Sequence, residues 1–129
     1  MAPKIFSGGE TIAEATEAPV LNSCGLYSLN QSASLVFLAD KIVTNDTGLM
    51  HMAAAFRKEI ISVWGNTIPG FGMHPYLPKD SSRKSYIFQV ENLDCRPCSK
   101  IGYDRCPKTH FNCMNKQDVD EMAKILNQN

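Results

Sequence analysis

The chain of 129 residues carries 13 Lys and Arg against 13 Asp and Glu, so its formal net charge is zero. This length fits one small domain with a core of its own, and the 43% hydrophobic and 20% charged content excludes wholesale disorder. The even charge balance argues against a nucleic-acid binder, because such proteins usually carry a basic excess.

The amino-terminal stretch is expected to begin with a strand. Residues 4–7 form a short apolar run that stops at Gly8-Gly9, which predicts a strand followed by a glycine turn. Residues 10–18 are rich in Ala and Glu and precede a proline, which predicts a helix. The first twenty residues contain three Glu and no apolar core, so they do not resemble a secretory signal. We therefore expect a cytoplasmic chain.

The next predicted elements are a helix over residues 29–39 and, before it, a short strand at Val20-Leu21. Ser28 and Gln31 form a capping box, in which the serine hydroxyl and the glutamine side chain each bond to the other residue's backbone N–H. Apolar residues recur at helical spacing after this box, so one face of the helix is expected to be buried.

The middle of the chain predicts a βαβ unit. A β-branched strand covers residues 41–44, a helix covers residues 49–56, and a second strand covers residues 60–64. Strands joined by a single helical crossover lie parallel, so the predicted fold class is α/β, with a parallel sheet and flanking helices.

The last third is expected to be richer in loops. Residues 66–84 form a long loop, residues 86–90 a further strand, and residues 94–114 a cysteine-bearing loop. Residues 116–127 repeat apolar side chains at helical spacing, which predicts a closing amphipathic helix. The whole chain, residues 1–129, is interpreted as one domain.

The strongest candidate site follows the first strand of the βαβ unit, where Asp46, Thr47, Gly48, Leu49 and His51 lie at the start of a helix. Ligands bind at the carboxyl ends of parallel strands, and the free N–H groups of a first helical turn favour phosphate. Glycine permits close approach, histidine could stabilise a leaving diphosphate, and the carboxylate suits a sugar hydroxyl. Alternatively, Asp46 or Thr47 only caps the helix.

Two weaker candidates accompany this site. The loop containing Gly65 and Thr67 follows the next strand, so it is expected at the same edge of the sheet, although a plain connecting loop is the simpler interpretation. Glu10 could accept hydrogen bonds from ribose hydroxyls, or it could merely favour the dipole of a first helical turn.

Four cysteines fall in the spacing C-x2-C-x7-C-x6-C: Cys95, Cys98, Cys106 and Cys113. Four thiolates can bind one zinc ion tetrahedrally, so a structural zinc site is one interpretation. Reduced structural thiols and a redox pair at Cys95 and Cys98 are the alternatives, and the neighbouring prolines disfavour the helix that a redox pair needs. Basic residues within and after this segment could meet an anionic lipid or polysaccharide acceptor or a phosphate, although a solvated surface is the simpler interpretation: Arg96, Lys100, Arg105, Lys108 and Lys116.

The run from Asn45 to Ala55 resembles the bacterial heptosyltransferases, glycosyltransferase family nine. Other pieces resemble that family in the same order along nearly the whole chain: Gly8-Gly9 with Glu10, Gly25 with Ser28-Leu29, Gly65 to Pro69 with Pro75-Tyr76, Cys95 to Cys98, and Cys113-Met114. The resemblance implies that residues 1–129 are a partial Rossmann-like domain. They correspond to the carboxyl-terminal part of an enzyme with two Rossmann domains (B-type), which binds a nucleotide-sugar such as ADP-heptose.

In that family the sugar passes to a lipopolysaccharide core with inversion and without a required metal or other cofactor. The resemblance implies that Thr47 and Gly48 hold the diphosphate, Asp46 contacts the sugar, His51 lies near the phosphates and Glu10 meets the ribose. It matches only about the last third of such an enzyme. We therefore expect the acceptor site and the catalytic base in an amino-terminal half outside this sequence.

Two further expectations concern activity and assembly. We expect this chain to be incomplete for catalysis on its own. Uncovered sheet edges in a partial domain favour self-association. The alternative function, from a different class, is a non-catalytic nucleotide-binding or zinc-stabilised interaction module.

Overall fold

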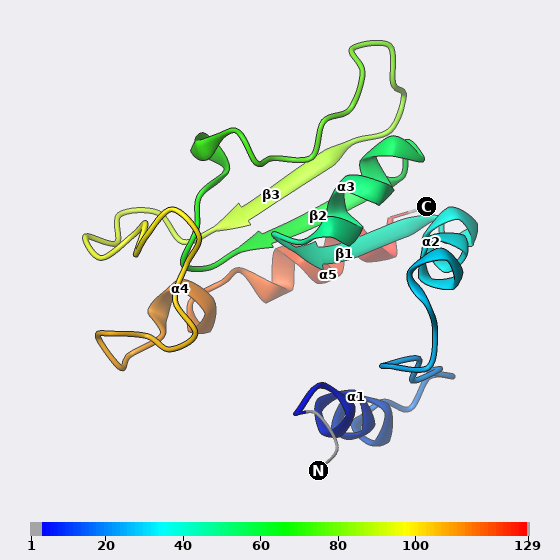
Figure 1. The fold of residues 1–129 in the computed structure, drawn as a ribbon, viewed down its shortest axis with the longest axis horizontal. Helices are drawn as coiled ribbons and strands as arrows, with labels where there is room; N and C mark the ends of the chain where they lie inside the picture. Colours follow the sequence, from blue (N-terminus) through cyan, green and yellow to red (C-terminus); the bar gives the residue numbers. More distant parts are fainter. Residues whose placement is uncertain (1–3, 129) are drawn as a thin grey trace. The chain divides into compact units, whose positions relative to one another are not determined.

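The computed structural model describes residues 4–128 and divides the chain into two compact units, Met1–Leu35 and Val36–Asn129. In the first unit, helix α1 spans Lys4–Ala15, so the strand predicted at residues 4–7 is wrong (Figure 1). The helix runs through both glycines. A side chain at Gly9 would lie 2.5 Å from Asn22 Oδ1 and 2.8 Å from Cys24 Sγ, so the missing Cβ lets the following loop pack against the helix.

This longer helix changes the place of Glu10, which lies in the middle of α1 and not after a glycine turn. The short strand predicted at Val20-Leu21 is also wrong, because this stretch has no regular structure. Helix α2, Leu29–Leu38, is confirmed together with its capping box. The Ser28 N–H donates to Gln31 Oε1 at 2.9 Å, and the Gln31 N–H donates to Ser28 Oγ at 3.4 Å.

The second unit is built on a parallel sheet, as predicted. Strands β1 (Lys41–Asn45), β2 (Glu59–Trp64) and β3 (Ser85–Gln89) lie in the order β1-β2-β3. The register pairs Lys41 with Glu59 and Ile60 with Ser85. All three strands therefore end at the same edge of the sheet, and the α/β fold class is confirmed.

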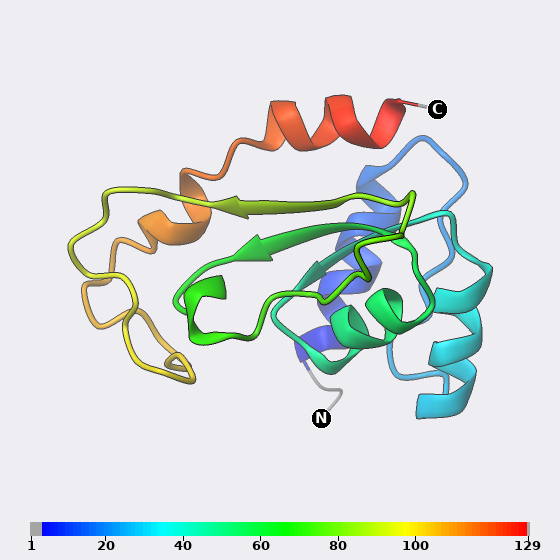
Figure 2. The same cartoon turned by 90° about the horizontal axis from the view of Figure 1, so that it is seen from above.

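Helices cover both faces of this sheet. Helix α3, Gly48–Ala55, connects β1 to β2 on one face, and α5, Val119–Asn127, lies along the other (Figure 2). The short helix α4, Asn112–Asn115, and the 3-10 turn η1, Pro69–Phe71, interrupt the loops that follow β3 and β2. Lys41 Nζ donates to the last carbonyls of α5, at 2.9 Å from Ile125 O, which fastens that helix to β1.

The core lies between α3 and the central strand. Met50, Ala53, Ile60 and Trp64 are fully buried and pack in one cluster. Residues 60–64 of β2 are all buried, as expected for a central parallel strand whose two faces are covered. Within residues 4–128, no helix combines the length and apolarity needed to cross a lipid bilayer.

Candidate functional site

The two sequence candidates of the second unit meet at the carboxyl edge of the sheet, as predicted. Asp46 follows β1 and is half-buried, while Thr67 follows β2 and is 8% exposed. The Thr67 hydroxyl donates to Asp46 Oδ2 at 3.0 Å. This contact joins residues 21 positions apart and fixes the carboxylate beside the start of α3.

The start of α3 is open. Thr47 occupies the N-cap position, yet its side chain makes no capping hydrogen bond and instead lies 3.3 Å from the Thr44 hydroxyl. The interpretation that Thr47 merely caps this helix with its side chain is therefore wrong, and the Asp46 carboxylate accepts from the Thr67 hydroxyl. A Cβ at Gly48 would meet no atom within 4 Å, so an anion can approach the first-turn N–H groups closely. Leu49 and His51 are exposed in the same two turns.

A cavity of about 290 Å³ adjoins this edge, and we call it the strand-end cavity. One wall comes from the ends of β1 and β2: Asn45, Asp46, Val63, Gly65, Asn66 and Thr67. The other wall comes from residues 101–114: Ile101, Tyr103, Asp104, Phe111 and Met114. The sequence analysis did not assign any residue of this second wall to the site.

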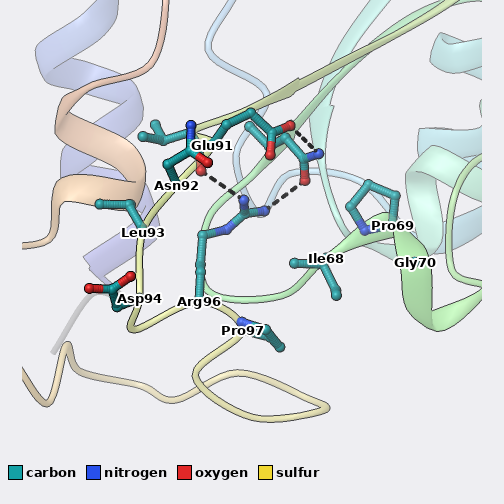
Figure 3. Close-up of a pocket in the computed structure, with 11 residues that line it drawn as sticks. Ile68, Pro69, Gly70, Glu91, Asn92, Leu93, Asp94, Arg96 and Pro97 are labelled. Atoms are coloured by element: carbon teal, nitrogen blue, oxygen red, sulfur yellow. Dashed lines mark hydrogen bonds between the residues drawn. The ribbon is translucent and has the colours of Figure 1, made fainter.

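Arg96 links the two walls and was also misinterpreted from sequence. Its guanidinium donates to the carbonyls of Gly65 and Thr67, and in addition to Val90 O and Gln89 Oε1 at 3.0 Å each. Figure 3 shows this side chain beside a second cavity of about 450 Å³ near the end of β3. Because these acceptors occupy its N–H groups, Arg96 holds the protein backbone and is not part of a solvated basic surface.

The remaining carbonyls of residues 64–67 are also bonded to later segments of the chain. Trp64 O accepts from Gln117 Nε2 at 3.0 Å, and Asn66 O accepts from the Cys98 N–H at 3.0 Å. The Asn66 side-chain amide donates to Tyr103 O at 2.9 Å. Residues 94–114, which we call the cysteine segment, are thus fastened directly to the loop that carries Thr67.

Gly65 has a packing role in this arrangement. A Cβ at this position would lie 2.9 Å from Met114 Sδ and 3.8 Å from Cys113 Sγ. Glycine therefore lets the cysteine segment lie against the end of β2. Glu10 belongs to the first unit, and its predicted contact with a ribose stays a prediction.

The four cysteines of this segment lie near one another, but their thiols do not converge on a single metal position. Burial raises the pKa of Cys98, and the neighbouring thiols of Cys95, Cys113 and Cys106 raise it further. Burial also raises the pKa of Cys113. Backbone N–H groups, that of Phe111 first, lower the pKa of Cys106. Within residues 4–128, no three His, Cys, Asp or Glu side chains are placed to hold one metal ion. The four-cysteine zinc site therefore stays a prediction.

His110 is a member of this cluster that the sequence analysis did not assign. Its Nε2 lies 3.8 Å from Cys95 Sγ, and its Nδ1 accepts from the Asn112 N–H at 3.0 Å. The spacing Cys106-x3-His110 was a usable signal, because short Cys–His separations are common in metal-binding turns.

Comparison with known proteins places the chain in a family. The profile of glycosyltransferase family 9 (heptosyltransferase) matches residues 8–105. The lipooligosaccharide heptosyltransferase 2 of Haemophilus influenzae is 33% identical over 87 residues, which cover 64% of this chain and 24% of that protein. The corresponding protein of Campylobacter jejuni serotype O:2 is 26% identical, over 85% of this chain and 33% of its own length.

The lipopolysaccharide heptosyltransferase 2 of Escherichia coli is 40% identical over 50 residues, which cover 39% of this chain and 14% of that protein. No solved structure gives a significant match. The chain therefore corresponds to no more than about a third of the length of these relatives. Since the family profile covers most of its residues, the chain belongs to glycosyltransferase family 9.

Proposed function

We propose that this chain binds the nucleotide-sugar donor of a glycosyltransferase. The observation that carries the proposal is the open start of α3 beside the Asp46–Thr67 pair. The Met50 N–H donates to Thr47 O at 3.1 Å, so the N–H groups of Gly48 and Leu49 are the ones that offer a site for a diphosphate, where the helix dipole also favours negative charge. The carboxylate beside them accepts hydrogen bonds from sugar hydroxyls.

The finer assignment follows from family membership and stays part of the proposal. The donor is ADP-heptose, and the sugar passes with inversion to a lipopolysaccharide core or related glycan. His51, exposed on α3, stabilises the leaving diphosphate. The base that deprotonates the acceptor is supplied outside the residues assigned here, so transfer is a property of the whole enzyme.

Location and assembly are proposed on the same basis. The enzyme works in the cytoplasm, at the inner face of the inner membrane where its glycolipid acceptor is exposed. Lys100, Arg105 and Lys108 are exposed and could contact that membrane surface, whereas Arg96 could not. Self-association remains a prediction.

Calorimetric titration with ADP and ADP-heptose tests the proposal. We expect Gly48→Val to weaken binding of both by at least tenfold, because its side chain fills the space over the first-turn N–H groups. The fold should persist, since the new Cβ meets no neighbour within 4 Å. Ala55→Val, at the opposite end of the same helix, is the matched control and should bind as the parent does.

Asp46→Asn distinguishes the contact with the sugar from the contact with the diphosphate. We expect it to weaken ADP-heptose binding more than ADP binding, because the sugar and not the diphosphate loses its acceptor. If Gly48→Val binds both ligands as tightly as the parent chain, the start of α3 is not the diphosphate site and the proposal is wrong.

A further inference from the structure

The second wall of the strand-end cavity has no role in the function proposed so far. It comes from the cysteine segment, more than 50 residues after Asp46, and brings Tyr103 and Asp104 to the same cavity as the Asp46–Thr67 pair. The cavity volume of about 290 Å³ suits a single sugar ring and not a complete nucleotide-sugar.

The chemistry of the lining favours an uncharged polyol. Its polar side chains are two carboxylates, two amides, the Thr67 hydroxyl and the Tyr103 phenol, and none of the Lys or Arg side chains that the structure describes lines it. Two carboxylates would repel a phosphate, whereas they accept hydrogen bonds from sugar hydroxyls. A diphosphate is better placed at the open start of α3, outside this cavity.

Two rings add the apolar surface that a sugar needs. Tyr103 is 55% exposed and Phe111 is 47% exposed, although both line the cavity. The C–H face of a pyranose ring packs on such rings, which removes apolar surface of both partners from water. Exposed aromatic rings that share a cavity with two carboxylates form a surface suited to carbohydrate recognition.

The wall is held in place and is not a free loop. The Asn66 amide donates to the Tyr103 carbonyl at 2.9 Å, and the Ser99 hydroxyl donates to Gly102 O at 2.9 Å. Gly102 has φ of +80°, and a Cβ there would lie 2.6 Å from Asn66 Oδ1. Glycine thus permits the tight turn that places residues 103 and 104 against the end of β2.

We propose that Tyr103 and Asp104 are specificity-determining residues that recognise the sugar of the donor. The inference rests on the proposed function. Asp104 accepts hydrogen bonds from sugar hydroxyls opposite those that Asp46 holds, and the Tyr103 ring packs on the C–H face. The diphosphate contributes nothing to this contact.

The test compares two ligands on each variant, ADP and ADP-heptose, by calorimetric titration. We expect Asp104→Asn and Tyr103→Ala each to weaken ADP-heptose binding about tenfold while ADP binding stays unchanged. Because ADP binding reports on the fold of each variant, a misfolded protein is recognised directly. Arg105→Gln changes the exposed neighbouring residue, which does not line the cavity, and should bind both ligands as the parent does.

Two results would overturn the inference. If both variants keep the parent's preference for ADP-heptose over ADP, residues 103 and 104 do not contact the sugar. If they lose ADP and ADP-heptose to the same extent, their role is in the fold. A parent chain that binds neither ligand contradicts the proposed function itself, which is a separate outcome.

Discussion

The two walls of the strand-end cavity are held in place by different means. The wall at the ends of β1 and β2 is supported by the parallel pairing of these two strands and by the buried cluster around Trp64. The wall from the cysteine segment has little regular structure, and hydrogen bonds from Arg96, Cys98 and Gln117 to backbone carbonyls hold it. One wall therefore depends on burial and the other on a few polar contacts.

This difference has a consequence for function. A sheet edge backed by a close-packed core has one conformation, which suits the diphosphate common to all nucleotide-sugars. A segment held by individual hydrogen bonds can change its side chains without disturbing the sheet. In the proposed site, the cysteine segment is thus the part whose side chains can vary most readily.

The largest expected effect comes from breaking the core that supports the first wall. Trp64 is fully buried, and its Nε1 donates to Ser62 Oγ at 3.0 Å. We expect Trp64→Ala to lower the free energy of unfolding by about 3–5 kcal/mol, because it leaves a cavity and removes the hydrogen bond that Ser62 Oγ accepts, although that hydroxyl still donates to Tyr86 O. Urea denaturation followed by circular dichroism measures this loss.

Tyr76→Ala is the matched control, since this aromatic ring is 73% exposed and its removal should change the free energy of unfolding by less than about 0.5 kcal/mol. Equal effects of the two substitutions would show that burial does not hold the first wall.

A smaller effect is expected from releasing the second wall. Arg96→Ala removes the partner of the Gly65 and Thr67 carbonyls, so we expect a loss of about 2–3 kcal/mol in the free energy of unfolding. Arg96→Lys should recover little of it, because one ammonium group cannot reach acceptors in several directions. Trypsin should then cleave the cysteine segment at Lys100, Arg105 and Lys108 while the sheet stays folded.

Arg83→Ala, which changes an exposed arginine, provides the comparison for this experiment. Cleavage of the cysteine segment at the parent rate in Arg96→Ala would contradict the idea that Arg96 fastens it.

Much of the first wall could be predicted from sequence. The alternation of a β-branched strand, a turn and an apolar helix predicted β1, α3 and β2, and parallel strands placed Asp46 and Thr67 at one edge. These inferences succeeded because periodicity reports directly on burial. The strand predicted at residues 4–7 failed because glycines were interpreted as a turn, whereas the close approach of Asn22 to Gly9 explains a glycine inside a helix.

The second wall could not be predicted in this way. Arg96 looks like any basic residue in a polar loop, and nothing in its neighbours shows that it faces the backbone of residues 65–67. Tyr103 and Asp104 likewise enter the cavity only because Asn66 and Gly102 shape the turn before them. Contacts between side chains and distant carbonyls have no period along the sequence.

The smallest expected effect concerns the thiols of the cysteine segment. Backbone N–H groups lower the pKa of Cys106, while burial raises the pKa values of Cys98 and Cys113. The thiolate is the reactive form, and a lowered pKa gives more thiolate at any pH below the ordinary value. In metal-free protein we therefore expect iodoacetamide to modify Cys106 at a lower pH than Cys98 or Cys113, as measured by peptide mass spectrometry.

Adding zinc extends the thiol-modification measurement to the predicted metal site. If the cysteine segment binds zinc as its spacing predicts, metal analysis should find one ion per chain, and bound zinc should protect all four thiols from modification at once.

The control for the metal-free experiment is the unfolded chain. In guanidinium the cysteines should no longer differ in the pH at which they are modified, because the backbone N–H groups no longer converge on Cys106. Modification of Cys98 before Cys106 in the folded, metal-free chain would show that residues 108–111 do not stabilise the thiolate.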